Sequence, residues 1–125
     1  MNKWVLPVNA KKVDIAEHFK KTDVFVWKAK KRFEKDDIIY VYLTSPIQEI
    51  RYQCKCIVEK VSEDILADHE YAKEPEVKKY AMFQLIKSYP EGVLPWAELH
   101  SNGLGQALLP SKVYTQLEEF INSKE

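Results

Sequence analysis

The chain has 125 residues, of which 46% are hydrophobic and 30% are charged, and its 19 basic side chains balance 19 acidic ones. A chain of this length and composition forms one globular domain, so we assign residues 1–125 to a single domain. The net charge of zero excludes a protein that binds polyanions through an overall positive charge, so any nucleic-acid contact depends on a local patch or pocket.

The apolar segments are short. The longest unbroken apolar run covers residues 38–43, whereas a membrane helix needs about 20 apolar residues. The N-terminal segment also lacks the apolar core of a signal peptide. We therefore predict a cytoplasmic protein with no membrane partner.

The first half of the chain predicts a strand, a helix and a second extended segment. A short strand is expected near residues 4–8, and a helix near 13–21, where Asp14 and Glu17 have the spacing of an N-terminal capping box. The extended segment, residues 22–27, ends at Trp27, and a basic stretch follows it.

The centre of the chain predicts two strands. Residues 38–43 are rich in β-branched and aromatic side chains and form the strongest predicted strand. The next strand is expected over residues 50–61, where alternation places Ile50, Cys54 and Cys56 on one face. We interpret both cysteines as buried thiols, because they are badly placed for a disulfide and lack the partner residues of a zinc site. We expect no metal and no cofactor.

The last third predicts an insertion, a strand and two helices. Residues 62–78 are charged and predict a short helical or irregular insertion, and residues 79–89 predict a strand. A short helix opens near Pro95, and residues 111–122 carry one apolar helical face. The fold class is therefore α+β, with a mixed or antiparallel sheet of a kind that can curl into a barrel.

Four blocks of sequence occur in a familiar order over nearly the whole chain. They are Trp4 to Asn9, Trp27 with the basic stretch through Leu43, Ile50 to Cys56, and Glu91 to Gln106. Together they resemble the EVE domain of the PUA-like superfamily, in the small stand-alone form found in Gram-positive bacteria. Asp36 stands where that family usually has a glycine.

The resemblance implies a PUA-like β pseudobarrel with flanking helices and a concave pocket. EVE domains are thought to accept a flipped, often modified base, which must be restacked on aromatic faces and hydrogen-bonded along its edge. The expected function is a non-catalytic nucleic-acid-binding module, with RNA or DNA carrying a modified base as partner. The choice between RNA and DNA and the oligomeric state are left open.

Several residues are candidates for this pocket. Trp27 is either a stacking platform or a core residue. Thr44 and Ser45, which follow Tyr42 at the end of the central strand, either read a base edge or make a turn. Asn9 reads a base edge or caps the following turn.

The remaining candidates are a second wall and a basic patch. Asn102 and Gln106, among two glycines, form a pocket wall or a helix C-cap. Trp96 either packs in the core or lies at the pocket rim. The basic patch makes phosphate contacts or is a solvated face; it consists of Lys28, Lys30, Lys31 and Arg32.

Two other functions stay open. Some ASCH-type relatives hydrolyse acylated nucleosides with a lysine, a threonine and a glutamate, and Lys28 or Lys30, Thr44 and Glu59 are the matching residue types here. The other alternative is a protein-interaction adaptor with a vestigial pocket. No residue is assigned a catalytic role.

Overall fold

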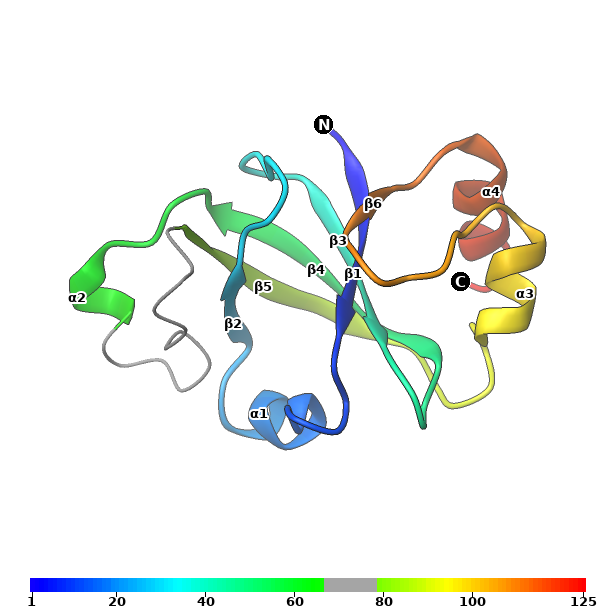
Figure 1. Cartoon of the computed structure of the whole chain (residues 1–125), viewed down its shortest axis with the longest axis horizontal. Coiled ribbons are helices and arrows are strands. Elements are labelled where there is room, and N and C mark those ends of the chain that lie inside the picture. Colours follow the sequence, from blue (N-terminus) through cyan, green and yellow to red (C-terminus); the bar gives the residue numbers. More distant parts are fainter. Residues whose placement is uncertain (67–78) are drawn as a thin grey trace.

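The structure is a computed structural model that describes residues 1–66 and 79–125 (Figure 1). The predicted insertion at 62–78 lies mostly outside the described residues. The elements in chain order are β1 (Lys3–Val8), α1 (Ile15–Lys21), β2 (Val24–Lys28), β3 (Ile38–Leu43), β4 (Glu49–Val58), α2 (Glu63–Leu66), β5 (Tyr80–Ser88), α3 (Trp96–Ser101), β6 (Ser111–Lys112) and α4 (Thr115–Ser123).

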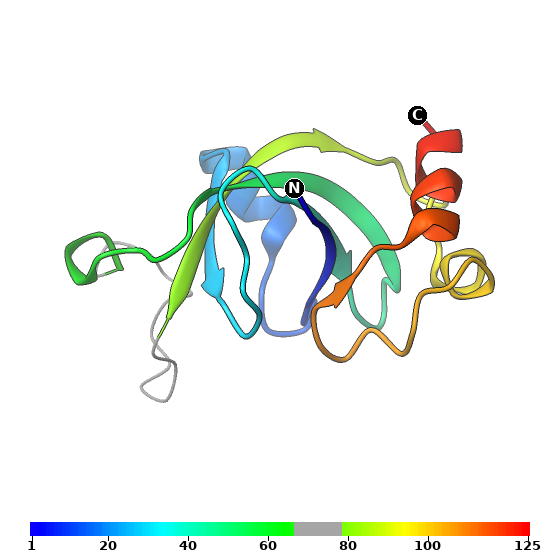
Figure 2. The same cartoon turned by 90° about the horizontal axis from the view of Figure 1, so that it is seen from above.

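The strands form one mixed sheet in the order β2-β5-β4-β3-β1-β6. The β1–β3 pair is parallel, and the other neighbouring pairs are antiparallel. The sheet bends into a trough, so that β2 and β1 lie across the concave side from each other although three strands separate them in the sheet (Figure 2). The predicted α+β pseudobarrel is confirmed, and the barrel is unclosed between β1 and β2.

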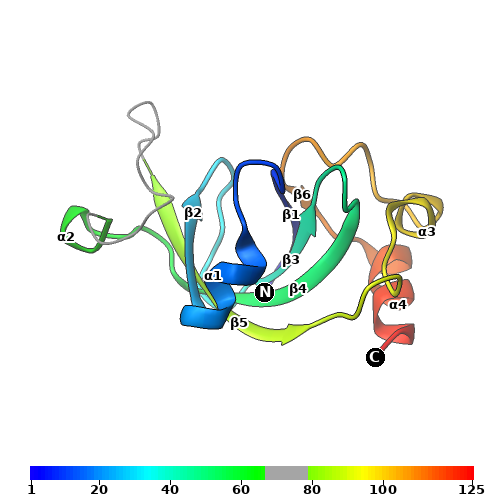
Figure 3. The same ribbon diagram turned by 90° about the horizontal axis from the view of Figure 1, so that it is seen from below.

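The central strands are buried on both faces. Ile39, Val41 and Leu43 of β3 point into the core of the trough, near α1. Tyr40 and Tyr42 pack on the other face, in the core that α3 and α4 cover (Figure 3). A strand covered on both faces needs apolar side chains at every position, which explains the unbroken apolar run of residues 38–43.

A β-bulge corrects the predicted alternation along β4. Val41 lies opposite Tyr52 and Tyr42 lies opposite Ile50, so Arg51 is an extra residue in the ladder. An extra residue shifts the side chains beyond it to the other face. Ile50 therefore packs in the outer core, whereas the two cysteines pack inside the trough.

Both cysteines are free thiols buried in the trough. Burial raises the pKa of Cys54 to about 12, and burial with the nearby carboxylates of Asp37 and Glu59 raises that of Cys56 to about 11. Because the thiolate is the reactive form, we expect Ellman's reagent to label the native protein only as fast as it opens, and both thiols at once in denaturant. Rapid labelling of the native protein would contradict this burial.

The helix ends follow local chemistry, with one correction. Asp14 Oδ1 accepts a hydrogen bond from the backbone N–H of Glu17 at 3.1 Å, which confirms the predicted cap of α1. The single helix predicted over 111–122 is wrong at its start. Residues 111–112 pair with β1 instead, Val113 N donates to Lys3 O at 2.8 Å, and α4 begins only at Thr115. Unpaired backbone groups on the edge of β1 outweigh the local helical pattern.

No helix within residues 1–66 and 79–125 combines the length and apolarity needed to cross a bilayer.

Candidate functional site

Parallel pairing of β1 and β3 brings two predicted site residues together. The two strands run in the same direction, so their carboxyl ends meet at one edge of the sheet. Thr44 N donates to Val8 O at 3.0 Å across that edge. Asn9 and Thr44 directly follow β1 and β3, and both line the same cavity.

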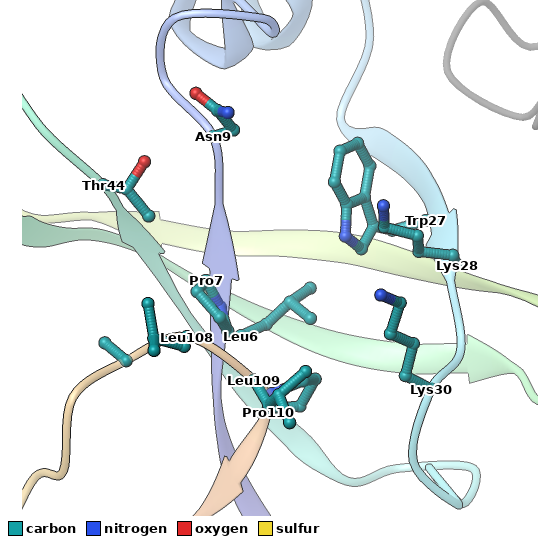
Figure 4. Close-up of a pocket in the computed structure, with 11 residues that line it drawn as sticks. Leu6, Pro7, Asn9, Trp27, Lys28, Lys30, Thr44, Leu108, Leu109 and Pro110 are labelled. Carbon is teal, nitrogen blue, oxygen red and sulfur yellow. The ribbon is translucent and has the colours of Figure 1, made fainter.

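This cavity, here called the first pocket, has a volume of about 350 Å³ and lies in the gap between β1 and β2. Figure 4 shows Trp27, Lys28 and Lys30 on one side of it, with Asn9 and Thr44 on the other. Its lining residues are Leu6, Pro7, Asn9, Trp27, Lys28, Lys30, Thr44, Ala107, Leu108, Leu109 and Pro110. Most of the wall is thus apolar, with five side chains that carry polar groups.

Trp27 belongs both to the core and to the wall of the first pocket. Its side chain is 8% exposed and stacks on Phe25 in the trough, with ring centroids 5.3 Å apart and an interplanar angle of 22°. The ammonium group of Lys28 lies 5.5 Å from the indole centroid, within the range of a cation–π contact. The indole is therefore held in place before any ligand arrives, and presents only its remaining surface to the cavity.

The polar side chains of the first pocket are mainly hydrogen-bond donors. Asn9 Oδ1 accepts from Lys11 N at 3.0 Å, which confirms the predicted turn cap and leaves the amide NH₂ as the group for a ligand. Lys28 and Lys30 extend their ammonium groups toward the cavity (Figure 4). The Thr44 hydroxyl, which can donate or accept, forms no hydrogen bond with the part of the chain that the structure describes.

A second pocket, of about 420 Å³, adjoins the first. It is lined by Tyr42, Thr44, Ser45, Gln48, Trp96, Gln106, Ala107 and Leu108. The two pockets share Thr44, Ala107 and Leu108. The structure thus divides the predicted base-binding residues that line a cavity. Asn9, Trp27, Lys28 and Lys30 line the first pocket only, Thr44 lines both, and the second pocket alone is lined by Tyr42, Ser45 and Gln106.

The aromatic side chains of the second pocket have fixed surroundings. Trp96 stacks on His100 with ring centroids 4.5 Å apart and planes 14° from parallel. His100 Nδ1 donates to Leu104 O at 2.7 Å, because a carbonyl oxygen can only accept. Burial, reinforced by the carboxylate of Glu49, raises the pKa of Tyr42 to about 12, so its phenol is neutral at physiological pH.

Four predicted candidates do not line either pocket. The Asn102 side chain donates to Glu98 O at 2.8 Å at the end of α3, where it acts as a cap. Lys31 and Arg32 are exposed beyond the rim. Glu59, the carboxylate of the hydrolase alternative, accepts from Lys35 N at 3.0 Å and is likewise absent from both linings.

Several lining residues are not among the site residues that the sequence predicts. The loop before β6 supplies Leu108 and Leu109, which are 75% and 56% exposed, together with buried Pro110. Gln48 lines the second pocket, and so does Trp96, for which the sequence leaves core packing and the pocket rim open. The signal that could have indicated a pocket rim is the pair Leu108 and Leu109 shortly after two glycines. Large apolar side chains in a turn-rich loop do not belong to a helix or strand face that packs into the core, so their exposure points to a binding surface.

Sequence comparison finds no relative: no protein-family model matches the chain, and no curated protein matches it.

Structural comparison finds several proteins of the same shape. A hypothetical protein from Leishmania major superposes with a TM-score of 0.70 at 15% identity, covering 98% of this chain and 93% of that one. A Pseudomonas putida protein gives a TM-score of 0.69 at 12% identity, covering 98% of each chain. An ASCH protein from Zymomonas mobilis gives 0.65 at 11% identity, covering 98% of this chain and 94% of that one. The chain therefore shares the fold of these proteins, the ASCH protein among them.

Proposed function

We propose that this protein is a non-catalytic nucleic-acid-binding module with a PUA-like fold. It accepts one unpaired or flipped base, plain or modified, in the first pocket. The observation that carries the proposal is the make-up of that pocket, in which a fixed indole, two lysines and two uncharged polar side chains surround one cavity. Among domains of this fold, the four sequence blocks favour the EVE branch.

The size of the first pocket supports a single base as its occupant. Small-molecule pockets span about 300–1,000 Å³ and are mostly apolar, with a few polar groups that fix orientation. At about 350 Å³ the first pocket is at the small end of that range. A base that has left its stack needs apolar surface for its faces and hydrogen-bonding groups for its edge. Both are present in the lining.

The lysines favour a ligand that carries phosphate. Lys28 and Lys30 are the charged residues of the lining, and both are cationic. Nucleic-acid backbones are held mainly by such side chains, which position the strand without reading its sequence. The net charge of zero makes this local pair, rather than the protein as a whole, the source of attraction.

The donor groups of the first pocket predict a preference among bases. Asn9 offers its amide NH₂ beside an oxygen that already accepts from Lys11 N, the lysines offer ammonium groups, and Thr44 can donate or accept. We therefore expect uridine to bind more tightly than cytidine, and inosine more tightly than adenosine, by about threefold to tenfold for one changed hydrogen bond. Each pair exchanges an exocyclic carbonyl for an amino group and a ring N–H for an acceptor nitrogen. The carbonyl oxygen offers two lone pairs to the donors and the ring nitrogen only one, so the carbonyl form gains one acceptor position. Calorimetric titration measures the difference. Equal or reversed affinities would contradict this donor-rich edge.

A matched pair of variants tests whether the first pocket is where nucleic acid binds. We expect the K28Q/K30Q variant to lose about tenfold or more in affinity for a short single-stranded RNA or DNA, because two phosphate contacts are removed. The slope of log affinity against log salt should also fall by about 0.7 for each lost contact. Fluorescence anisotropy with a labelled oligonucleotide measures both quantities.

The control is the K31Q/R32Q variant, which removes the same charge from the same stretch but outside both pocket linings. It should retain most of the affinity. If the two variants lose affinity equally, general charge attraction explains the binding and the pocket proposal fails. If the unmodified protein binds no oligonucleotide at all, the adaptor alternative takes its place.

Hydrolysis of acylated nucleosides is the second candidate. Lys28, Lys30 and Thr44 do line one pocket, as that chemistry requires. Glu59, however, lies outside the lining and is engaged with the backbone of Lys35. The arrangement thus lacks the carboxylate of the expected set, which favours binding over catalysis. Release of acetate from an N-acetylated nucleoside would reverse that preference.

A further inference from the structure

We propose that the second pocket binds the neighbouring nucleotide of the same strand, so that the complete site takes two consecutive nucleotides. The inference rests on the proposed function of the first pocket and goes beyond it by assigning a second subsite.

The two pockets are contiguous. Thr44, Ala107 and Leu108 line both of them, so a ligand that fills one cavity passes these residues to enter the other. Thr44 is half-buried at this boundary, and its hydroxyl forms no hydrogen bond with residues 1–66 or 79–125. The sugar–phosphate link between two bases must cross the same boundary, where a hydroxyl is a suitable partner.

The second pocket has an aromatic wall that is fixed in advance. One face of the Trp96 indole is covered by the parallel ring of His100, which is in turn fixed to Leu104 O. Trp96 is half-buried, so part of its surface faces the cavity. Stacking on such a side chain is tolerant of sequence, because every base has a π-face.

The polar groups of the second pocket suit a base rather than a phosphate. None of the residues that line it is charged, in contrast to the first pocket. Ser45, Gln48 and Gln106 are exposed and form no side-chain hydrogen bond within the described residues. Hydroxyl and amide groups both donate and accept, so they can pair with the edge of any base.

The backbone of the second pocket is also unusual. Gln48 has φ 54° and Ala107 has φ 55°, both in the left-handed region that residues other than glycine rarely adopt. Strained positions of this kind concentrate at ligand sites, where the surrounding structure maintains them. Both residues line the second pocket, and Ala107 also lies at its boundary with the first.

The test compares a mononucleotide with a dinucleotide by calorimetric titration, using uridine monophosphate and the UpU dinucleotide, with the deoxyribose forms as separate arms. We expect UpU to bind about tenfold or more tightly than the mononucleotide, as one added stack provides. W96L and Q106A should remove this advantage and leave the affinity for the mononucleotide unchanged. Q106A changes an exposed side chain, so it tests the subsite without risk to folding. The deoxyribose arms show whether RNA or DNA is preferred.

The matched control is E98Q, which changes an exposed residue of the same helix as Trp96 outside both pocket linings. It should leave both affinities unchanged. A dinucleotide that binds no tighter than the mononucleotide overturns the second subsite while the proposed function stands. If Q106A weakens the binding of the mononucleotide and the dinucleotide equally, the second subsite is overturned as well. Failure of both ligands to bind overturns the proposed function and this inference together.

Discussion

Replacing Trp27 with alanine should weaken binding of a single-stranded oligonucleotide about tenfold or more, and should also lower the free energy of unfolding by about 3–5 kcal/mol. The two effects arise from the two sides of one side chain. The side stacked on Phe25 belongs to the trough core, and the other side lines the first pocket. Removal of a buried indole leaves a cavity in the core and enlarges the pocket at the same time.

A second substitution separates these effects. W27F keeps an aromatic ring against Phe25 and removes the part of the indole that extends further. We expect it to cost only about 1 kcal/mol of stability and still to weaken binding several-fold. Denaturant unfolding and anisotropy titration measure the two quantities on the same protein. If W27F binds as well as the parent, Trp27 is a core residue only, and its assignment to the binding site is wrong.

Replacing Asp37 with alanine should lower the free energy of unfolding by about 3 kcal/mol, with no direct effect on the pocket. Asp37 is fully buried. Its Oδ1 accepts from Asn2 N at 2.8 Å, and its Oδ2 accepts from Trp4 Nε1 at 3.0 Å and from Glu34 N at 2.9 Å. Loss of the carboxylate leaves these donors without a charged acceptor, and an unsatisfied buried group costs about 1–3 kcal/mol.

Two further variants test this interpretation of Asp37. D37N should still cost about 2 kcal/mol, because an amide places its own N–H groups against one of the donors. W4F removes a single donor and should cost less than D37A, provided the phenyl ring keeps the contact with Phe33. Equilibrium denaturation in urea measures all three. Wild-type stability of D37N would show that the charged acceptor is unimportant.

The sequence predicted the strands well where local pattern and burial agree. The span of β3 is the predicted one, since residues 38–43 are apolar throughout and are covered on both faces. Asp36 has φ 74°, so the turn before β3 does require a left-handed residue at the position that the resemblance to EVE domains singled out. The bulge at Arg51 and the short β6 could not be predicted, because both depend on partner strands distant in the sequence.

The sequence predicted several residues of the site but not how they are arranged in space. Strand-end position indicated Asn9 and Thr44, yet only the parallel pairing of β1 and β3 places them at one edge. Trp27 reaches the same cavity because the sheet curls, which no local pattern encodes. The division into two pockets depends on the loop before β6, in which Leu104 and Ala107 are buried in the outer core.

The most direct test of a base-binding first pocket follows the indole N–H signals of the three tryptophans by ¹⁵N NMR during titration with a short single-stranded oligonucleotide. We predict that the Trp27 signal shifts saturably, because its indole lines the pocket. The Trp4 signal should stay in place, because its N–H is buried and bonded to Asp37. An oligonucleotide that binds while the Trp27 signal remains unmoved would contradict the account.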